Sequence, residues 1–242
     1  MQSPMIKKEI SDDLKIMTIA LDRPPVNAWT KEGYIELSSA IAEANASTTI
    51  SVVILKAHGR MFSAGADVKT LAADSVEDAA RRRPLLRKAA FDLMECQVPV
   101  IAAVHGLAIG MGAVVVTSAD VIIAAEGAEL AIPEINVGVA GAAAAIRRIV
   151  PEHLARSMAL TGRRFTVERL YEIGSVEKVV PKESLEAEAY ELAELISSKG
   201  YLAVRKWKES LNLTEPGMGR RGLMIEQCLG QELSLLSNPP SL

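Results

Sequence analysis

The chain has 242 residues, of which 49% are hydrophobic and 4% aromatic, and it carries a formal net charge of −3 at pH 7. This length allows one or two domains with a large core, and the aliphatic excess favours packed α/β layers over a disordered or fibrous chain. The slight negative charge gives no electrostatic reason to expect nucleic acid as a partner.

The first half of the chain alternates between strand and helix patterns. Residues 5–21 alternate polar and apolar side chains and predict a pair of strands. Thr30 precedes apolar residues at three- and four-residue intervals, so we expect a helix there with Thr30 as its N-cap. A short buried strand is predicted at 52–55. Residues 69–84 are polar and lack a firm period, which predicts an irregular segment before a helix near 85–94.

The second half continues the alternation. Apolar runs at 98–104 and 119–124 predict two more strands, and the segment 110–117 between them predicts a helix that begins at its first or second residue. A further strand is expected at 176–180, and Ser184 is expected to cap the helix that follows. Strands that alternate with helices favour an α/β layered domain.

No segment predicts membrane insertion or export. The first eight residues lack the apolar core of a signal peptide, and the longest apolar region, 98–125, is interrupted by His105 and several glycines. Cys96 and Cys228 lie far apart in sequence, which predicts two reduced thiols without a disulfide frame or a zinc-type spacing. We therefore expect a cytoplasmic protein that does not bind a membrane.

Two turns rich in small residues follow apolar strands and carry most of the functional information. They are Phe-Ser-Ala-Gly-Ala-Asp at 62–67 and Gly-Leu-Ala-Ile-Gly-Met-Gly at 106–112. Small side chains let another molecule approach the main chain and leave backbone N–H groups free to donate. Two such turns can aim two N–H groups at one oxygen, as in an oxyanion hole. Either turn alone is also what a tight strand-to-helix connection requires.

These segments resemble the signatures of the crotonase (enoyl-CoA hydratase/isomerase) superfamily. Residues 62–68 are similar to the first signature and residues 99–112 to the second. Segments 21–28, 118–124 and 133–138 add further similarity in the family's order. The resemblance covers roughly residues 6 to 200.

The resemblance implies an α/β fold, a crotonase-like spiral of ββα units followed by a C-terminal helical trimerisation region. We accordingly expect a spiral core that binds acyl-CoA at 1–183 and a helical region at 184–242. It also implies a homotrimer or a dimer of trimers. Residues 227–240 lack the Asp…Glu-Gly…Ala-Phe stretch of many members, so coenzyme affinity or subunit closure is expected to differ.

The same resemblance implies that the backbone N–H groups of Ala66 and Met111 form an oxyanion hole for an acyl-CoA thioester. At the start of a helix, the Met111 N–H would lack an intrahelical acceptor. The other candidates for binding substrate and coenzyme A are Pro25, Val26, Ala28, Ala64, Gly65, Asp67, Val68, Gly110, Val114, Pro133 and Gly141. His105 is expected to make a structural hydrogen bond rather than act as a base. No separate cofactor is expected, because coenzyme A is part of the substrate, and no metal is expected.

The carboxylates decide which reaction is expected. Glu134 matches the second glutamate of family hydratases, and flanking Ile132 and Ile135 should place it in an apolar pocket that raises its pKa. The first glutamate would fall at Val114, and no Asp or Glu lies between residues 96 and 118. A single acid/base favours double-bond isomerisation over hydration. The alternatives are a hydratase, lyase or hydrolase that uses Glu134 alone, and a non-catalytic acyl-CoA-binding relative.

Overall fold

The computed structural model describes residues 4–13, 15–67, 76–214 and 228. A six-stranded sheet in the order β1-β2-β3-β4-β6-β9 forms its centre. Its strands are β1 Ile6–Ile10, β2 Ile16–Leu21, β3 Val52–Ala57, β4 Val100–Val104, β6 Val121–Ala125 and β9 Lys178–Val180. Only β1 pairs antiparallel, with β2, and the other neighbours are parallel. A smaller sheet consists of β5 Leu107–Ile109, β7 Glu129–Ala131 and β8 Phe165–Thr166.

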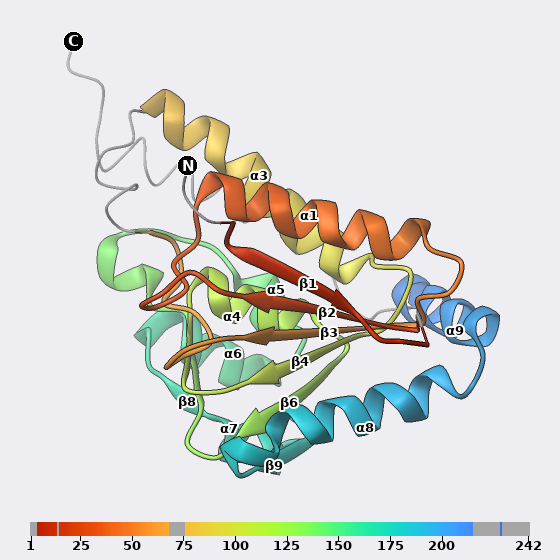
Figure 1. Cartoon of the computed structure of the whole chain (residues 1–242). Coiled ribbons are helices and arrows are strands. Elements are labelled where there is room, and N and C mark those ends of the chain that lie inside the picture. The colour runs from red at the N-terminus through yellow and green to blue at the C-terminus, as the bar shows by residue number, and fades with distance from the viewer. Residues whose placement is uncertain (1–3, 14, 68–75, 215–227, 229–242) are drawn as a thin grey trace.

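Helices cover both faces of the large sheet. The α-helices are α1 Lys31–Ala46, α3 Val76–Met94, α4 Met111–Ser118, α5 Ala143–Arg147, α6 Glu152–Thr161, α7 Val167–Glu172, α8 Leu185–Ser197 and α9 Tyr201–Thr214. Two 3-10 helices are η1 Glu134–Val137 and η2 Lys182–Ser184. Figure 1 shows α1 and α3 side by side along one face of the sheet and α8 along the other. Among the described residues, no helix is both long and apolar enough to cross a membrane.

The strand side chains divide between two hydrophobic cores. Along β3, Val53 and Leu55 join the larger core under α1 and α3, whereas Val52 and Ile54 join the smaller core under α8. This division follows from the alternation of side chains along a strand. Parallel strands that are buried on both faces have continuous apolar sequences. The apolar runs of β3, β4 and β6 therefore allowed these strands to be predicted from the sequence. Residues of α8 belong to the smaller core together with residues of the sheet. The boundary between spiral core and helical region, expected after residue 183, stays a prediction.

Several expected elements are confirmed, and two need correction. The strand pair β1–β2 is present, and the Thr30 hydroxyl caps α1 by accepting the Gly33 N–H at 3.2 Å. The helix predicted near 85–94 begins already at Val76 and contains Pro84, so the prediction of an irregular segment is wrong for 76–84. A proline lacks the N–H of a regular helix, and it disguised the helical pattern.

The predicted side-chain cap of α8 is also wrong. The helix begins at Leu185, but the Ser184 side chain makes no capping hydrogen bond, because Ser184 closes the 3-10 turn η2 in a helical conformation. Both free cysteines agree with the expected reduced thiols, and Cys96 is buried. The expectations for Val68 and for most of the segment after residue 214 lie outside the described residues.

An ion pair with a buried lysine fastens α9 to the sheet. Lys208 is 2% exposed, and its ammonium donates to the Asp120 carboxylate. The other oxygen of Asp120 accepts the N–H of Val100, the first residue of β4, at 2.8 Å. The pair therefore joins the last described helix to the strand that precedes the second small-residue turn.

Replacing Lys208→Met should leave the Asp120 carboxylate, whose side chain is 20% exposed, without its cation, and we expect a loss of about 2 kcal/mol in unfolding free energy. Chemical denaturation of the variant measures this loss. Lys206→Met on the same helix removes an exposed pair with Glu209 and is expected to cost under about 1 kcal/mol. Equal losses in the two variants would contradict a structural role for the pair of Lys208 and Asp120.

Candidate active site

The loop that carries the first small-residue turn is fixed on one side by β5. The N–H of Ser63 donates to the Leu107 carbonyl at 3.0 Å, and the N–H of Ile109 donates back to the Ser63 carbonyl at 2.9 Å. These bonds form a parallel bridge that brings the first turn against the segment preceding α4. Two stretches separated by about forty residues are thus joined.

The same loop is fixed on its other side by Trp29. The Trp29 N–H donates to the Gly65 carbonyl at 2.8 Å, and the Asp67 N–H donates to the Trp29 carbonyl at 3.0 Å. In a trans peptide the C=O and the N–H point in opposite directions. Since the Gly65 carbonyl faces Trp29, the N–H of Ala66 in the same peptide points away from it. Within the described part of the chain this N–H finds no acceptor.

The two turns touch through their glycines, and Glu134 lies at the contact. A Cβ added to Gly65, whose φ is +87°, would lie 2.8 Å from the Ile109 carbonyl oxygen and 3.7 Å from the Gly110 Cα. A Cβ on Gly110 would lie 2.7 Å from Oε1 of Glu134 and 3.9 Å from the Gly65 Cα. Only residues without a side chain fit at both positions. The main chain of each turn therefore lies beside the same carboxyl group.

Met111 begins α4 immediately after Gly110. The Gly110 N–H donates to the Ala131 carbonyl at 2.8 Å, and the Val114 N–H donates to the Gly110 carbonyl at 2.9 Å. The Met111 N–H, the first of the helix, has no acceptor among the described residues, as is usual for a first turn. Its side chain is buried in the larger core. The helix dipole favours negative charge at this N–H.

Glu134 combines a buried carboxyl oxygen with an apolar setting. Its Oε2 is buried and has no hydrogen-bond partner among the described groups. Burial raises the pKa of this carboxyl, and a hydrogen bond from its own backbone N–H acts in the opposite direction. The predicted direction of the pKa is confirmed. The predicted flank is half wrong, because Ile132 is buried but the side chain of Ile135 is 42% exposed.

The structure brings most of the other predicted residues to this place. The segment from Pro25 to Ala28 runs beside the first turn, and the Ala64 N–H donates to the Val26 carbonyl at 2.9 Å. Pro133 directly precedes η1. Val114 lies one turn into α4 and is 5% exposed.

Two predicted residues stay untested by the contacts of the site. Gly141 lies in the loop between η1 and α5, where no atom lies within 4 Å of an added Cβ, so its place in the substrate site stays a prediction. Val68 is outside the described residues. Within the described ranges, no group of His, Cys, Asp or Glu side chains could hold a metal ion.

A buried polar network beneath the first turn escaped the sequence reasoning. The Asn27 amide is 2% exposed and donates to three carbonyls of the loop 58–62. The Ser63 hydroxyl donates to the Asn27 carbonyl at 2.7 Å and accepts the Gly65 N–H at 3.1 Å. Small polar side chains next to a glycine turn were the available signal. The structural role expected for His105 is confirmed, since its Nε2 lies 3.0 Å from the Gly59 carbonyl oxygen.

Comparison with known proteins adds an independent observation. The sequence model of the family described as enoyl-CoA hydratase/isomerase matches residues 12–233. The "(7aS)-7a-methyl-1,5-dioxo-2,3,5,6,7,7a-hexahydro-1H-indene-carboxyl-CoA hydrolase" of Rhodococcus jostii (strain RHA1) is 37% identical over 224 residues, covering 91% of this chain and 86% of the relative. The 2,3-dehydroadipyl-CoA hydratase of Escherichia coli (strain K12) is 30% identical over 227 residues, covering 91% and 87%.

A solved structure supports the same relationship. A probable enoyl-CoA hydratase from Mycobacterium thermoresistibile matches with a TM-score of 0.86 at 29% identity, covering 97% of this chain and 99% of that one. The match confirms the expected crotonase-like α/β fold with a helical C-terminal region.

The contact between the two turns should make Gly65→Ala costly. The new Cβ meets the rigid carbonyl of Ile109 and occupies a positive φ, so we expect a loss of about 3 kcal/mol in unfolding free energy. Gly59→Ala is the matched control, because its φ is +91° with nothing within 4 Å of the added Cβ. It should lose only the strain of about 1 kcal/mol. Denaturant titrations compare the two, and equal losses would contradict the close approach.

The buried carboxyl predicts a pH-dependent effect of Glu134→Gln. The folded-state pKa of Glu134 is raised above its ordinary value of 4.5. Between these two pKa values the folded protein keeps a proton on Glu134 that the unfolded chain has lost. The free energy of unfolding therefore falls as pH rises through this range. The neutral glutamine escapes this penalty, so the stability of the variant relative to the wild type should rise as pH increases from about 4 to about 8. Thermal unfolding across this range measures the gain. The exposed control Glu172→Gln should show little change, and a pH-independent difference for Glu134→Gln would refute burial of the charge.

Proposed function

Because this chain belongs to the enoyl-CoA hydratase/isomerase family, we propose that it acts on an acyl-CoA thioester through an enolate formed beside the thioester carbonyl. The observation that carries this proposal is the meeting of Gly65, Gly110 and the Glu134 carboxyl at one place. Two backbone donors and one acid/base would then lie in one site.

The N–H groups of Ala66 and Met111 would donate to the thioester carbonyl oxygen. Both lack acceptors among the described residues, and the first is aimed by the bond between Trp29 and Gly65. Negative charge grows on the carbonyl oxygen as the neighbouring carbon loses a proton, and donors fixed in advance stabilise that charge most. One such donor typically contributes about 3 to 4 kcal/mol to the transition state.

Glu134 would act as the single acid/base, and the reaction we favour is isomerisation of a 3-enoyl-CoA. The carboxylate takes a proton from C2, and the electron pair spreads over the carbonyl oxygen and C4. The same carboxyl then returns the proton to C4, so the double bond moves from C3–C4 to C2–C3 without a net change in atoms. A carboxyl whose pKa is raised toward neutrality suits both steps.

The apolar side chain at the other expected acid position supports this choice. Val114 is buried in α4 and cannot hold or activate a water as a second carboxylate would. Hydration needs a proton acceptor for water and a proton donor for carbon, whereas isomerisation needs only one group that does both. A hydratase or a lyase that uses Glu134 alone is the less favoured outcome of the test.

The similarity to a hydrolase of a dioxo-indene-carboxyl-CoA favours a second candidate, hydrolysis of a cyclic 3-oxoacyl-CoA. Water would lose a proton to Glu134 and add to the ketone carbon. The bond between this carbon and C2 would break, and its electron pair would leave as the thioester enolate held by the two N–H groups. Protonation of C2 by Glu134 would complete a ring-opened carboxylic acid.

Assembly into a homotrimer or a dimer of trimers, and a cytoplasmic location, stay predictions from the sequence.

Incubation in deuterated water with a linear 3-enoyl-CoA, crotonyl-CoA and a cyclic 3-oxoacyl-CoA tests these roles. We expect the 3-enoyl-CoA to become a 2-enoyl-CoA with deuterium exchange at C2, followed by mass spectrometry and NMR. Glu134→Gln should lower the rate about 10²- to 10⁴-fold, as expected for loss of a general acid/base. Glu172→Gln, on the exposed end of α7, is the control and should keep the wild-type rate.

The other outcomes of this experiment are equally specific. Ring opening of the 3-oxoacyl-CoA without isomerisation would favour the hydrolase. Rapid hydration of crotonyl-CoA would overturn the preference for a reaction with one carboxylate. Binding of all three thioesters with no exchange at any carbon would identify a non-catalytic acyl-CoA-binding relative.

A further inference from the structure

A single arginine joins the two segments that fix the Ala66 peptide. Arg23 follows β2, and its Nη2 lies 2.8 Å from Oδ2 of Asp67. Its Nη1 donates to the Ala28 carbonyl at 2.9 Å. Asp67 is the residue after Ala66, and Ala28 is the residue before Trp29. One guanidinium therefore bonds to both sides of the Trp29–Ala66 bridge.

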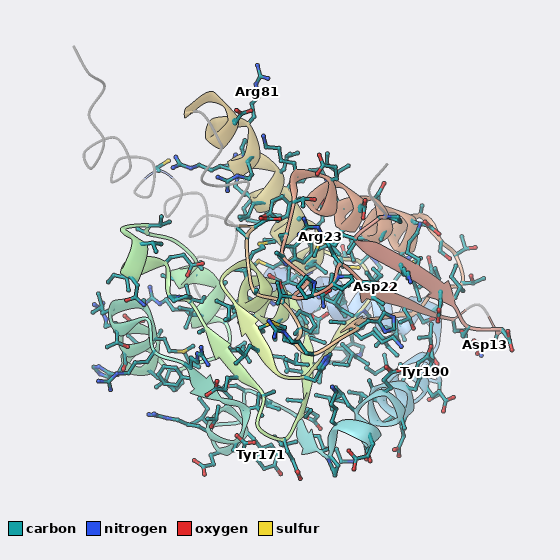
Figure 2. All side chains as sticks on the ribbon, turned by 60° about the vertical axis from the view of Figure 1, so that its left-hand side comes forward. Asp13, Asp22, Arg23, Arg81, Tyr171 and Tyr190 are labelled. Carbon is teal, nitrogen blue, oxygen red and sulfur yellow. The ribbon has the colours of Figure 1, made fainter. Side chains whose placement is uncertain are left out.

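Arg23 is itself held in place. Its backbone N–H donates to the Asn27 side-chain oxygen at 2.9 Å, and its carbonyl accepts the Asn27 N–H at the same distance. The side chains of Arg23 and Asp67 are only 30% and 14% exposed. Figure 2 shows the contrast with Arg81, which stands at the outer end of α3, while Arg23 lies within the outline of the fold beside Asp22. A partly shielded charge pair of this kind is weakened less by water than a surface pair.

The direction of the Ala66 N–H depends on this arrangement. Gly65 precedes it and has a positive φ, so the peptide before Ala66 has a flexible residue on its upstream side. On the downstream side Asp67 is held by the Trp29 carbonyl through its N–H and by Arg23 through its carboxylate. Releasing the carboxylate from Arg23 removes one of the bonds that oppose rotation of that peptide.

We propose that Arg23 is a positioning residue that fixes the Ala66 N–H in the direction of the substrate carbonyl oxygen. This inference rests on the proposed role of Ala66 as an oxyanion donor. The planar guanidinium matches the task because its two nitrogens hold two acceptors at a fixed separation and angle. A lysine in its place provides one flexible point charge, which can follow Asp67 or the Ala28 carbonyl but does not lock the two together.

Kinetics of Arg23→Lys give the first test. Charge is kept, so we expect binding of the thioester to change little and the chemical step to slow. With the acyl-CoA that the wild type turns over, kcat should fall about 10- to 100-fold, up to what losing one oxyanion donor costs, while KM changes less than about threefold. The matched control is Arg156→Lys, which alters an exposed arginine paired with Glu152 at 2.7 Å and should leave both constants unchanged.

Vibrational spectroscopy of the bound thioester gives the second test. Crotonyl-CoA labelled with ¹³C at the carbonyl is bound to Glu134→Gln, which prevents turnover. Hydrogen bonds from the two N–H groups should lower its carbonyl stretching frequency relative to free thioester. Adding Arg23→Lys to this background should reduce that shift by roughly half, whereas adding Arg156→Lys should keep it. A general loss of packing would lower the unfolding temperature without changing the carbonyl frequency of the molecules that remain folded.

The outcomes separate this inference from the proposed function. No shift of the carbonyl band in Glu134→Gln alone would overturn the proposed oxyanion site itself. A full shift and an unchanged kcat in Arg23→Lys would leave that site standing and overturn the positioning role. Should Arg23→Lys fail to fold, Asp67→Ala provides the same readout, because it removes the acceptor of the Arg23 Nη2 bond and keeps the bond from Nη1 to the Ala28 carbonyl. A full shift in this second variant would likewise overturn the inference.

Discussion

The direction of one peptide group, the one joining Gly65 to Ala66, governs the whole site. Its carbonyl accepts a hydrogen bond from Trp29, and its N–H consequently points away from Trp29. The loop cannot rotate as a unit, because Ser63 is bridged to Ala108 on the opposite edge. The large sheet contributes by setting where these segments leave the ends of β2, β3 and β4. Fold and site are therefore linked through a few backbone hydrogen bonds rather than through a set of converging side chains.

The second governing constraint is space. Gly65 and Gly110 approach so closely that a side chain on either would displace the neighbouring main chain or the Glu134 carboxyl. The carboxyl is thereby confined between a helix start and a 3-10 turn, with one oxygen buried. This confinement raises its pKa, and the same burial that destabilises the charged form suits it to accept and return a proton. Burial of the Glu134 carboxyl therefore both suits it to proton transfer and lowers the stability of the folded protein.

The sequence revealed the features that depend on local composition. Buried parallel strands appeared as apolar runs, the two turns appeared as clusters of small residues, and Glu134 stood out within a recognisable motif. The extension of α3 to Val76 was missed because Pro84 and a run of arginines hide its period. The ion pair between Arg23 and Asp67 was missed because it joins residues 44 positions apart, and sequence spacing says nothing of such contacts. The exposure of Ile135 was likewise set by the tertiary position of η1 rather than by its apolar neighbours.

Both proposed donors, the N–H groups of residues 66 and 111, belong to the main chain, and this has a consequence for how such a protein diverges. Every residue except proline has a backbone N–H, so positions 66 and 111 can accept new side chains and still donate a hydrogen bond. Methionine at the second position is an instance, with its thioether packed into the interior. Substitutions of the side chains around the site can therefore change the substrate while both backbone donors are kept. Alanine scanning leaves both proposed donors in place, because alanine keeps the backbone amide, whereas replacement of single amides by esters removes them.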